Sequence, residues 1–232
     1  MAIEWEREAV IKELVDEFGE EYRDEIEETL SLDEGEWADF GDSGSVEIDG
    51  ERYTLIKDED EAERIAIEVV KEELQNEPES FNKDWLSNFI YITETDKNII
   101  LADEESFLRE DAEYEAEQEF EDKYLELDEI EDEEERIRRK EELDAEKERW
   151  IEEYIKERLK DFERGLEDPV NYFVYEEGMY TLDNLLKQPW IQIDIDEASR
   201  DAVNIDGWEH FLSRYDGTYN TTKNGLVYFI EG

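Results

Sequence analysis

The stretch from Glu110 to Asp122, EDAEYEAEQEFED, contains eight acidic residues among thirteen and no basic residue. It lies within residues 103–167, where Gly165 is the only glycine and proline is absent. Because glycine and proline are the residues that most often interrupt a helix, this segment predicts one very long helix or two stacked helices. The expected fold is therefore built around a long, strongly acidic helix or helical hairpin.

The middle of this segment, residues 131–149, is polar on all sides apart from Ile137 and Leu143. Three acids stand four residues before an arginine, an order that stabilises a helix by roughly 0.2–0.5 kcal/mol per pair. These pairs are Asp132 with Arg136, Glu134 with Arg138 and Glu135 with Arg139. A helix that is polar all round usually crosses solvent, so the pattern leaves open a solvated connector and a functional arm.

The whole chain of 232 residues has 75 acidic against 25 basic residues, which gives a formal net charge of −50. We divide it by charge into residues 1–102 (net −24), 103–168 (net −19) and 169–232 (net −7). These segments are predicted to be an acidic α+β N-terminal region, a long charged helical arm and a small α+β C-terminal region. Six tryptophans, 12 tyrosines and 10 phenylalanines can build folded cores, which argues against a disordered chain.

Apolar periodicity outside the arm predicts a helix-rich α+β fold with small antiparallel hairpins. Helices are expected at residues 3–30 (with a break at Gly19), 60–75, 83–92, 181–186 (capped by Thr181), 196–205 and 207–213. A strand is expected at residues 190–195, and hairpins at residues 45–57 and 219–230, with turns at Asp49-Gly50 and Asn224-Gly225.

Composition limits the chemistry that the chain can perform. The absence of cysteine excludes disulfides, zinc–thiolate sites, iron–sulfur clusters and cysteine nucleophiles, and no phosphate-binding glycine loop is present. The single histidine, His210, fits an amphipathic helix better than a catalytic or metal site. The many carboxylates leave a paired-carboxylate site open, but we predict no enzyme, no catalytic residue, no metal and no cofactor.

The acidic surface also limits the partners. Its potential repels phosphate, so neither direct nucleic-acid binding nor an anionic membrane is expected. No run approaches the roughly 20 apolar residues of a membrane span, and the N-terminal sequence does not resemble a signal peptide. We therefore expect a cytoplasmic protein in the host cell.

Solubility does not explain the charge, because a small domain needs a net charge of only roughly 2–8 in magnitude. In the stretch quoted first, Glu113, Glu117 and Glu121 form one line at i,i+4, and Glu115 and Glu119 form another. On a helix such carboxylates repeat about every 6 Å, so two lines approach the charge density of a DNA strand. The pattern predicts a DNA mimic that inhibits its partner by occupying a nucleic-acid-binding surface.

The expected partner is the basic DNA-binding surface of a host defence or DNA-processing protein. That protein would be a restriction enzyme, a CRISPR effector, a nuclease or a defence ATPase. The first set of predicted contacts is Glu110, Asp111, Glu113, Glu115, Glu117, Glu119, Glu121 and Asp122. The second set is Glu131, Asp132, Glu133, Glu134 and Glu135. The oligomeric state stays open, a homodimer included.

Two alternatives remain open beside the DNA mimic. The first is an acidic adaptor or scaffold that binds basic proteins. The second is a halophile-adapted cytoplasmic protein, although the acids comprise 51 glutamates and 24 aspartates, and lysine is not selectively depleted.

A short stretch near the C-terminus, Ile193-Asp-Ile-Asp-Glu-Ala-Ser-Arg-Asp201, resembles a motif of ArdA-type antirestriction proteins. The matching positions are Ile193, Asp194, Asp196, Arg200 and Asp201. The resemblance covers about nine residues and implies a strand-to-helix junction. It also implies an acidic DNA mimic, encoded by a plasmid or phage, that blocks restriction enzymes.

Overall fold

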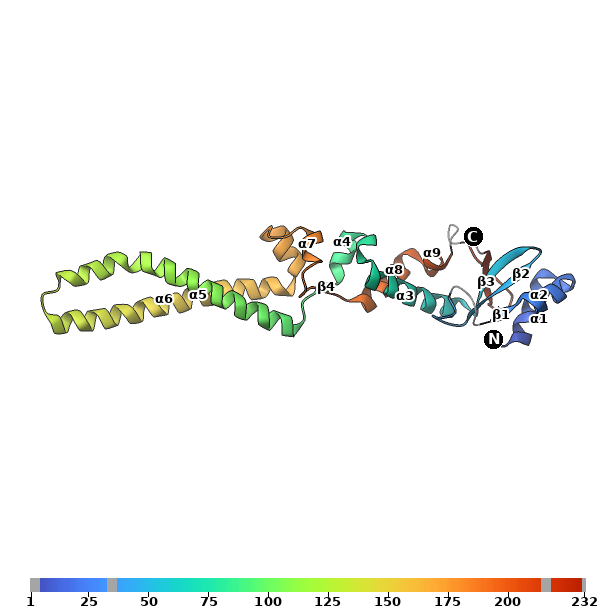
Figure 1. Ribbon diagram of the computed structural model, residues 1–232, viewed down its shortest axis with the longest axis horizontal. Coiled ribbons are helices and arrows are strands. Elements are labelled where there is room, and N and C mark those ends of the chain that lie inside the picture. The colour runs from blue at the N-terminus through green and yellow to red at the C-terminus, as the bar shows by residue number, and fades with distance from the viewer. Residues whose placement is uncertain (1–4, 33–36, 214–217, 231–232) are drawn as a thin grey trace. The chain divides into compact units, whose positions relative to one another are not determined.

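The computed structural model describes residues 5–32, 37–213 and 218–230. It forms two compact units, which we call the sheet unit and the hairpin unit (Figure 1). The sheet unit combines Met1–Phe89 with Asp194–Gly232, and the hairpin unit is Ile90–Ile193. The predicted helix-rich α+β class, with a long helix and a small antiparallel sheet, is confirmed.

The sheet unit contains a five-stranded antiparallel sheet in the order β1-β2-β3-β7-β6. Its strands are β1 (Ser31–Leu32), β2 (Ser43–Ile48), β3 (Glu51–Ile56), β6 (Asn220–Thr221) and β7 (Val227–Ile230). Both predicted hairpins are present, with Asp49 and Gly50 at positive φ in the first turn. Since Thr54 of β3 lies opposite Phe229 of β7, the C-terminal segment completes the sheet that the N-terminal segment begins.

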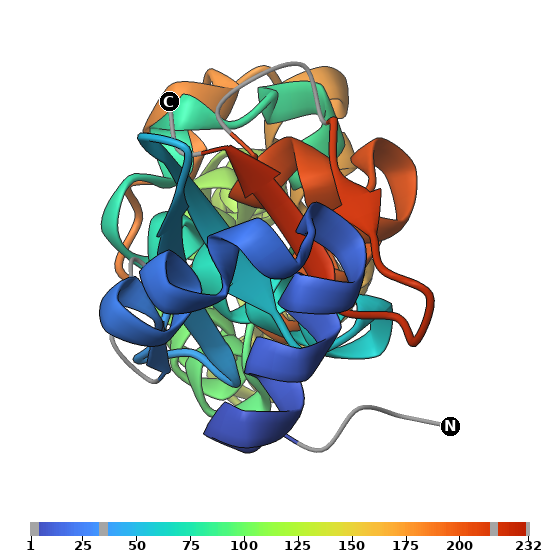
Figure 2. The same ribbon diagram turned by 90° about the vertical axis from the view of Figure 1, so that its right-hand side faces the viewer.

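Helices α1 (Arg7–Phe18) and α2 (Arg23–Thr29) cross one face of this sheet (Figure 2). The predicted break at Gly19 is confirmed: this residue has φ 123°, a conformation that favours glycine, and a 3₁₀ turn (Glu20–Tyr22) follows it. Apolar side chains of both helices pack on the sheet to form the main core of this unit. They include Val10, Leu14 and Ile26 from the helices and Ile48 and Leu55 from the strands.

Helix α3 (Glu59–Asn76) packs against α8 (Ile195–Asp206) and α9 (Trp208–Leu212) in the same unit. A 3₁₀ turn (Pro78–Ser80), α4 (Lys83–Leu86) and another 3₁₀ turn (Ser87–Phe89) follow α3. The helix predicted over residues 83–92 is wrong at its end. Ile90 and Tyr91 form strand β4, because they pair with Ile193 and Gln192 of β5 in the hairpin unit.

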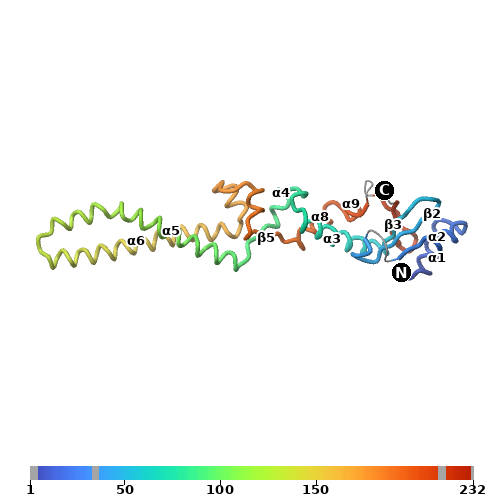
Figure 3. Tube along the Cα trace, in the orientation of Figure 1, coloured from blue at the N-terminus to red at the C-terminus, as the bar shows by residue number. Residues whose placement is uncertain are grey.

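The hairpin unit is dominated by α5 (Glu94–Leu125) and α6 (Glu133–Glu167), which lie side by side and are joined by a short 3₁₀ turn (Glu126–Glu129) (Figures 1 and 3). The two alternatives left by the sequence therefore resolve as a helical hairpin. Small residues on α5, Ala112 and Ala116, let it approach Ile151 and Ile155 of α6 closely. A π-helical turn (Asn171–Glu176) and α7 (Leu182–Leu185) complete the unit, and Thr181 caps α7 as predicted.

Packing divides the chain differently from charge. The nearly ordinary composition after residue 168 suggested a separate C-terminal region, but residues 169–193 pack in the hairpin unit. The residues from Asp194 onward belong with the first 89, because β7 pairs with β3 and α8 packs on α3. In the described residues no helix combines the length and the apolar character that a bilayer crossing requires.

Candidate partner-binding surface

The two helices of the hairpin carry very different charge. Helix α5 has 13 acidic and three basic residues, whereas α6 has 14 acidic and ten basic residues. The net charges are therefore −10 and −4 for helices of similar length. The uncompensated charge of the hairpin is thus concentrated on α5, the helix that carries the first set of predicted contacts.

The eight acids of that set lie in two rows on α5, which contain the two i,i+4 lines described in the sequence. Residues on an α-helix advance by about 100° each, so Glu115 and Glu117 point to nearly opposite flanks. The buried face of α5 is defined by Leu108, Ala112, Ala116 and Phe120. The outer row is Glu110, Glu113, Glu117 and Glu121, and it lies about 125° around the helix from the centre of the buried face. The inner row is Asp111, Glu115, Glu119 and Asp122, and it lies about 85° from that centre on the opposite side.

Two acids of the inner row, Asp111 and Glu115, border aromatic and basic groups of α6. Tyr154 donates its hydroxyl hydrogen to Asp111 Oδ2 over 2.9 Å, and the charge of Glu115 also acts on this tyrosine. The guanidinium of Arg158 lies 4.6 Å from the centre of the Tyr154 ring, while Trp150 stacks on that ring. The flank that carries the inner row is therefore partly compensated, and Asp111, only half exposed, has a structural role.

The outer row is exposed and has no ion-pair or hydrogen-bond partner among the described side chains. The two basic residues that flank residues 110–122 on α5 are directed to α6 instead. Arg109 lies 3.7 Å from Glu148, and Lys123 lies 2.9 Å from Glu146. The carboxylates of the outer row are therefore available to a partner.

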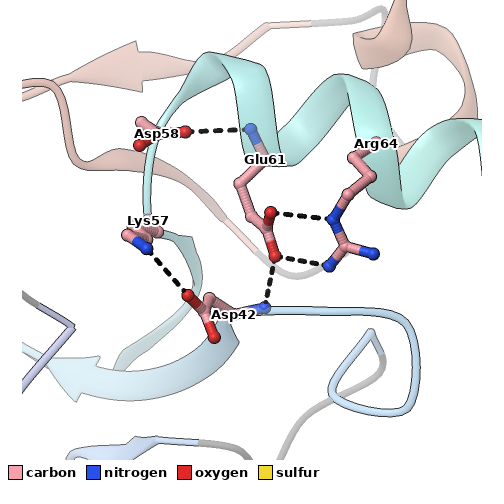
Figure 4. Close-up of polar contacts among 5 residues, drawn as sticks. All are labelled: Asp42, Lys57, Asp58, Glu61 and Arg64. Atoms are coloured by element: carbon pink, nitrogen blue, oxygen red, sulfur yellow. Dashed lines mark hydrogen bonds and ion pairs between the residues drawn. The ribbon is translucent and has the colours of Figure 1, made fainter. Parts of the chain in front are cut away.

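Carboxylates of the sheet unit provide a contrast, as the start of α3 shows (Figure 4). Glu61 accepts two hydrogen bonds from Arg64, at 2.9 and 2.6 Å, and a third from the backbone of Asp42 at 2.7 Å. Arg64 is the largest influence that lowers the pKa of Glu61. Lys57 in turn lies 3.0 Å from Asp42, and Asp58 caps the helix through the backbone nitrogen of Glu61. These acids are occupied by contacts within the fold.

The second set of predicted contacts has a structural explanation. Asp132 accepts hydrogen bonds from the backbone nitrogens of Glu134 and Glu135, at 2.9 and 3.0 Å, and so caps α6. The next three residues, Glu133–Glu135, lie in the first turn, where the helix dipole favours negative charge. All five residues from Glu131 to Glu135 are exposed. The stabilisation of the helix start is enough to explain why acids cluster here, so these residues are weaker candidates for partner contacts than the outer row.

The three predicted i,i+4 ion pairs do not form in this geometry. Arg138 lies 3.9 Å from Glu135, and Arg139 lies 3.0 Å from Glu142, both at i,i+3. Asp132 is engaged as the cap of α6, where its carboxylate accepts hydrogen bonds from the backbone.

The residues of the C-terminal motif lie at a strand-to-helix junction, as the resemblance implied. Asp194, after β5, caps α8 through the backbone nitrogen of Glu197. Asp196 pairs with Lys71 of α3 at 2.9 Å, and Asp201 accepts a 2.8 Å hydrogen bond from the indole of Trp85. These acids stabilise the packing of α8, and Arg200 is exposed.

His210 lies in the last turn of α9, where it is exposed and contacts the Phe211 ring edge to face. Across the described ranges no three histidine or acidic side chains are placed to hold a metal ion together. His210 lies on the predicted helix, but its side chain is exposed and does not pack against the fold.

Sequence reasoning missed an apolar cavity of about 560 Å³ in the hairpin unit, beside the N-terminal part of α5. Phe107 is 68% exposed and lines this cavity. Its position in the sequence carried a signal, because it lies off the stripe from Leu108 to Phe120 that faces α6.

Comparison of the chain with models of protein families, with curated proteins and with solved structures gave no match.

Proposed function

We propose that the protein is a DNA-mimic inhibitor that occupies the nucleic-acid-binding surface of a host defence or DNA-processing protein. In this proposal it acts in the host cytoplasm as a counter-defence protein of a phage or mobile element. The observation that carries the proposal is the outer row of α5, a line of exposed carboxylates without partners in the described structure.

The charge density supports the comparison with DNA. The outer row carries four acids over twelve residues, which corresponds to one charge per about 4.5 Å of helix axis. Each strand of duplex DNA carries one charge per about 3.4 Å. The packed α5–α6 hairpin holds these charges on a helical scaffold, so little conformational entropy is lost when a partner binds them.

Inhibition would follow from competition alone. The negative potential of the hairpin steers it toward a basic cleft, and the outer row then takes the place of phosphates. Both the rate of association and the affinity should fall steeply with salt, as they do for nucleic acid itself. No bond is made or broken in this mechanism.

Two charge-matched variants test the outer row. E113K/E117K/E121K reverses three charges of the outer row, and E115K/E119K/D122K reverses three charges of the inner row. The first should weaken binding to the target at low salt by at least about 100-fold, since it turns three attractive contacts into repulsive ones. The second should weaken it much less. Equal losses in the two variants would contradict the assignment to the outer row.

The target is identified by affinity capture on the immobilised chain followed by elution with duplex DNA at constant ionic strength. The proposal expects DNA to release the captured protein, and the free chain to inhibit that protein's action on DNA. A captured protein that duplex DNA does not displace would instead favour the acidic adaptor.

A further inference from the structure

The apolar cavity of the hairpin unit is bordered by large side chains that are unusually exposed. Ile99, Phe107 and Met179 are 57%, 68% and 61% exposed, and all three line the cavity. Single exposed apolar residues are common on protein surfaces, but several around one hollow typically mark a binding site.

The wall of the cavity is already formed by packed aromatic rings. Phe173 lies at the centre, with ring centroids 5.9 Å from Phe162, 6.0 Å from Tyr180 and 5.5 Å from Trp190. Phe173 also belongs to the buried core of the unit together with Leu166 and Leu185. Because the core holds these rings in place, the wall can receive an apolar group without reorganising. Small-molecule binding sites are usually preformed in this way.

The rim of the cavity is acidic. Asp96, Asp103 and Glu104 border it, whereas no lysine or arginine is among its described lining residues. Glu104 is only partly exposed, and this burial raises the pKa of its carboxyl group. A group that fills the cavity and also satisfies its rim must therefore be apolar in its centre and positively charged around it.

The cavity and the outer row lie on one face of α5. Residues spaced three or four apart lie on the same face of a helix, and Ile99, Asp103, Phe107 and Glu110 have this spacing on α5. The same spacing continues through Tyr114, which is 61% exposed, to Glu117 and Glu121 of the outer row. One helical face therefore begins at an aromatic hollow and continues as unpaired carboxylates.

We infer that this cavity binds a bulky apolar side chain, of the size of tryptophan, from a lysine- or arginine-rich segment of a protein partner. The inference rests on the proposed function for the basic character of that partner and adds the source of its specificity. A nucleic acid does not fit this role, because its phosphates would meet the acidic rim. The charged row attracts basic surfaces in general, whereas the cavity selects among them by an anchor residue.

Two peptides that differ only at one residue test the inference. They are Lys-Lys-Trp-Lys-Lys and Lys-Lys-Ala-Lys-Lys, which carry the same charge. The chain has two methionines, so labelling with ¹³C-methyl methionine lets Met179 report on the cavity, with Met179→Leu to assign its signal. We expect the tryptophan peptide to shift the Met179 signal and to bind about ten-fold more tightly than the alanine peptide.

Matched variants locate the effect. I99S/F107S removes two exposed cavity residues, and L125S/I137S removes two exposed apolar residues of the same hairpin that do not line the cavity. The preference for tryptophan should fall below two-fold in the first variant and persist in the second. Equal binding of both peptides to the wild type, or a preference that survives I99S/F107S, would overturn the inference. So would a Met179 signal that changes with protein concentration alone, because a second copy would then fill the cavity.

The experiment separates this inference from the proposed function. If E113K/E117K/E121K loses inhibition but retains the preference for tryptophan, both the row and the cavity have their assigned roles. If duplex DNA never competes with the partner but the preference persists, DNA mimicry fails while the cavity remains a site for a basic protein segment.

Discussion

Tyr154 on α6 donates a 2.9 Å hydrogen bond to Asp111 on α5, so one of the eight predicted contact acids serves the packing of the hairpin itself. Burial of Tyr154, together with this bond to a carboxylate, raises the pKa of the phenol. The neutral phenol is therefore favoured in the folded state. The stability it contributes is fully present below the ordinary tyrosine pKa of about 10 and is lost as the pH rises through the folded value.

Removing this hydroxyl should destabilise the hairpin modestly. Tyr154→Phe keeps the ring and its stacking on Trp150 but loses the hydrogen bond, so the free energy of unfolding should fall by about 1 kcal/mol at pH 7. Urea denaturation measures this value. Tyr114→Phe is the matched control, because the Tyr114 side chain is 61% exposed and should show almost no change. An equal loss in both variants would argue against a role for the Asp111 bond.

The close approach of α5 and α6 depends on small residues. Ala116 is fully buried against α6, so Ala116→Leu should lower the free energy of unfolding by about 1–3 kcal/mol through overpacking. Ala145 is an exposed alanine on α6, and Ala145→Leu should be nearly neutral. Thermal unfolding followed by circular dichroism at 222 nm compares them. A neutral Ala116→Leu would mean that the helices are not packed at this position.

Glu13 should make the sheet unit sensitive to acid. Its carboxylate is 7% exposed and accepts bonds from the backbone and the side chain of Asn224, at 3.0 and 2.6 Å. Burial alone would raise its pKa, but hydrogen bonds from Thr222 and Asn224 outweigh burial and lower it. Its contribution to stability is therefore present above the ordinary value of 4.5 and lost as the pH falls through the lower folded value.

Glu13→Gln should accordingly lower the free energy of unfolding at pH 7 by about 1–2 kcal/mol. The difference from the wild type should shrink as the pH falls below about 4. Denaturation curves at pH 7, 5 and 3.5 measure it, with Glu8→Gln on the exposed side of α1 as the control. A difference that does not change with pH would contradict a charged Glu13 in the folded state.

Reversal of the outer row should not unfold the protein. In E113K/E117K/E121K the three side chains still carry like charges at i,i+4, so the repulsion within the row is about the same, while the net charge of the chain falls in magnitude from −50 to −44. The midpoint of thermal unfolding should therefore stay equal or rise slightly. This measurement is also the control for the binding experiment, since a large drop would make a loss of inhibition uninformative about contact.

Salt should stabilise the chain at moderate concentration. The Debye length shortens from roughly 30 Å at 0.01 M to about 10 Å at 0.1 M, so added salt screens much of the repulsion from 50 net negative charges. We expect the melting temperature to rise over this range and the protein to be folded at 0.1 M. Unfolding at 0.1 M with recovery only in molar salt would favour the halophile-adapted alternative.

Local features of the fold could be predicted because each depends on a few neighbouring residues. The break at Gly19, the turn at Asp49-Gly50 and the cap at Thr181 all follow from conformations that those residues favour. The strand at Ile90 and Tyr91 could not be predicted, because the partner that makes it a strand lies about 100 residues away. For the same reason the pairing of β3 with β7 was not visible in the sequence.

The candidate surface was predicted in composition and in part of its geometry. The charge count identified residues 110–122 and helical spacing gave two lines of acids, but neither showed which line lies farther from α6 or that Asp111 is held by Tyr154. That distinction needs the position of the partner helix, and the aromatic wall beside Phe107 needs residues from α6, from the π-helical turn and from the segments on either side of α7.

The hairpin unit is inserted into the sheet unit, and this order has a consequence for synthesis on the ribosome. All residues from Ile90 to Ile193 have been added before the chain reaches β7, which the sheet unit needs to pair with β3. The hairpin unit can therefore fold while the sheet is still incomplete, since domains generally fold as units as they emerge. The edge of β3 stays unpaired until β7, more than 170 residues later in the chain, has been synthesised. In the growing chain the acidic hairpin is complete during this interval, and its charge can keep the unfinished sheet from associating with other chains.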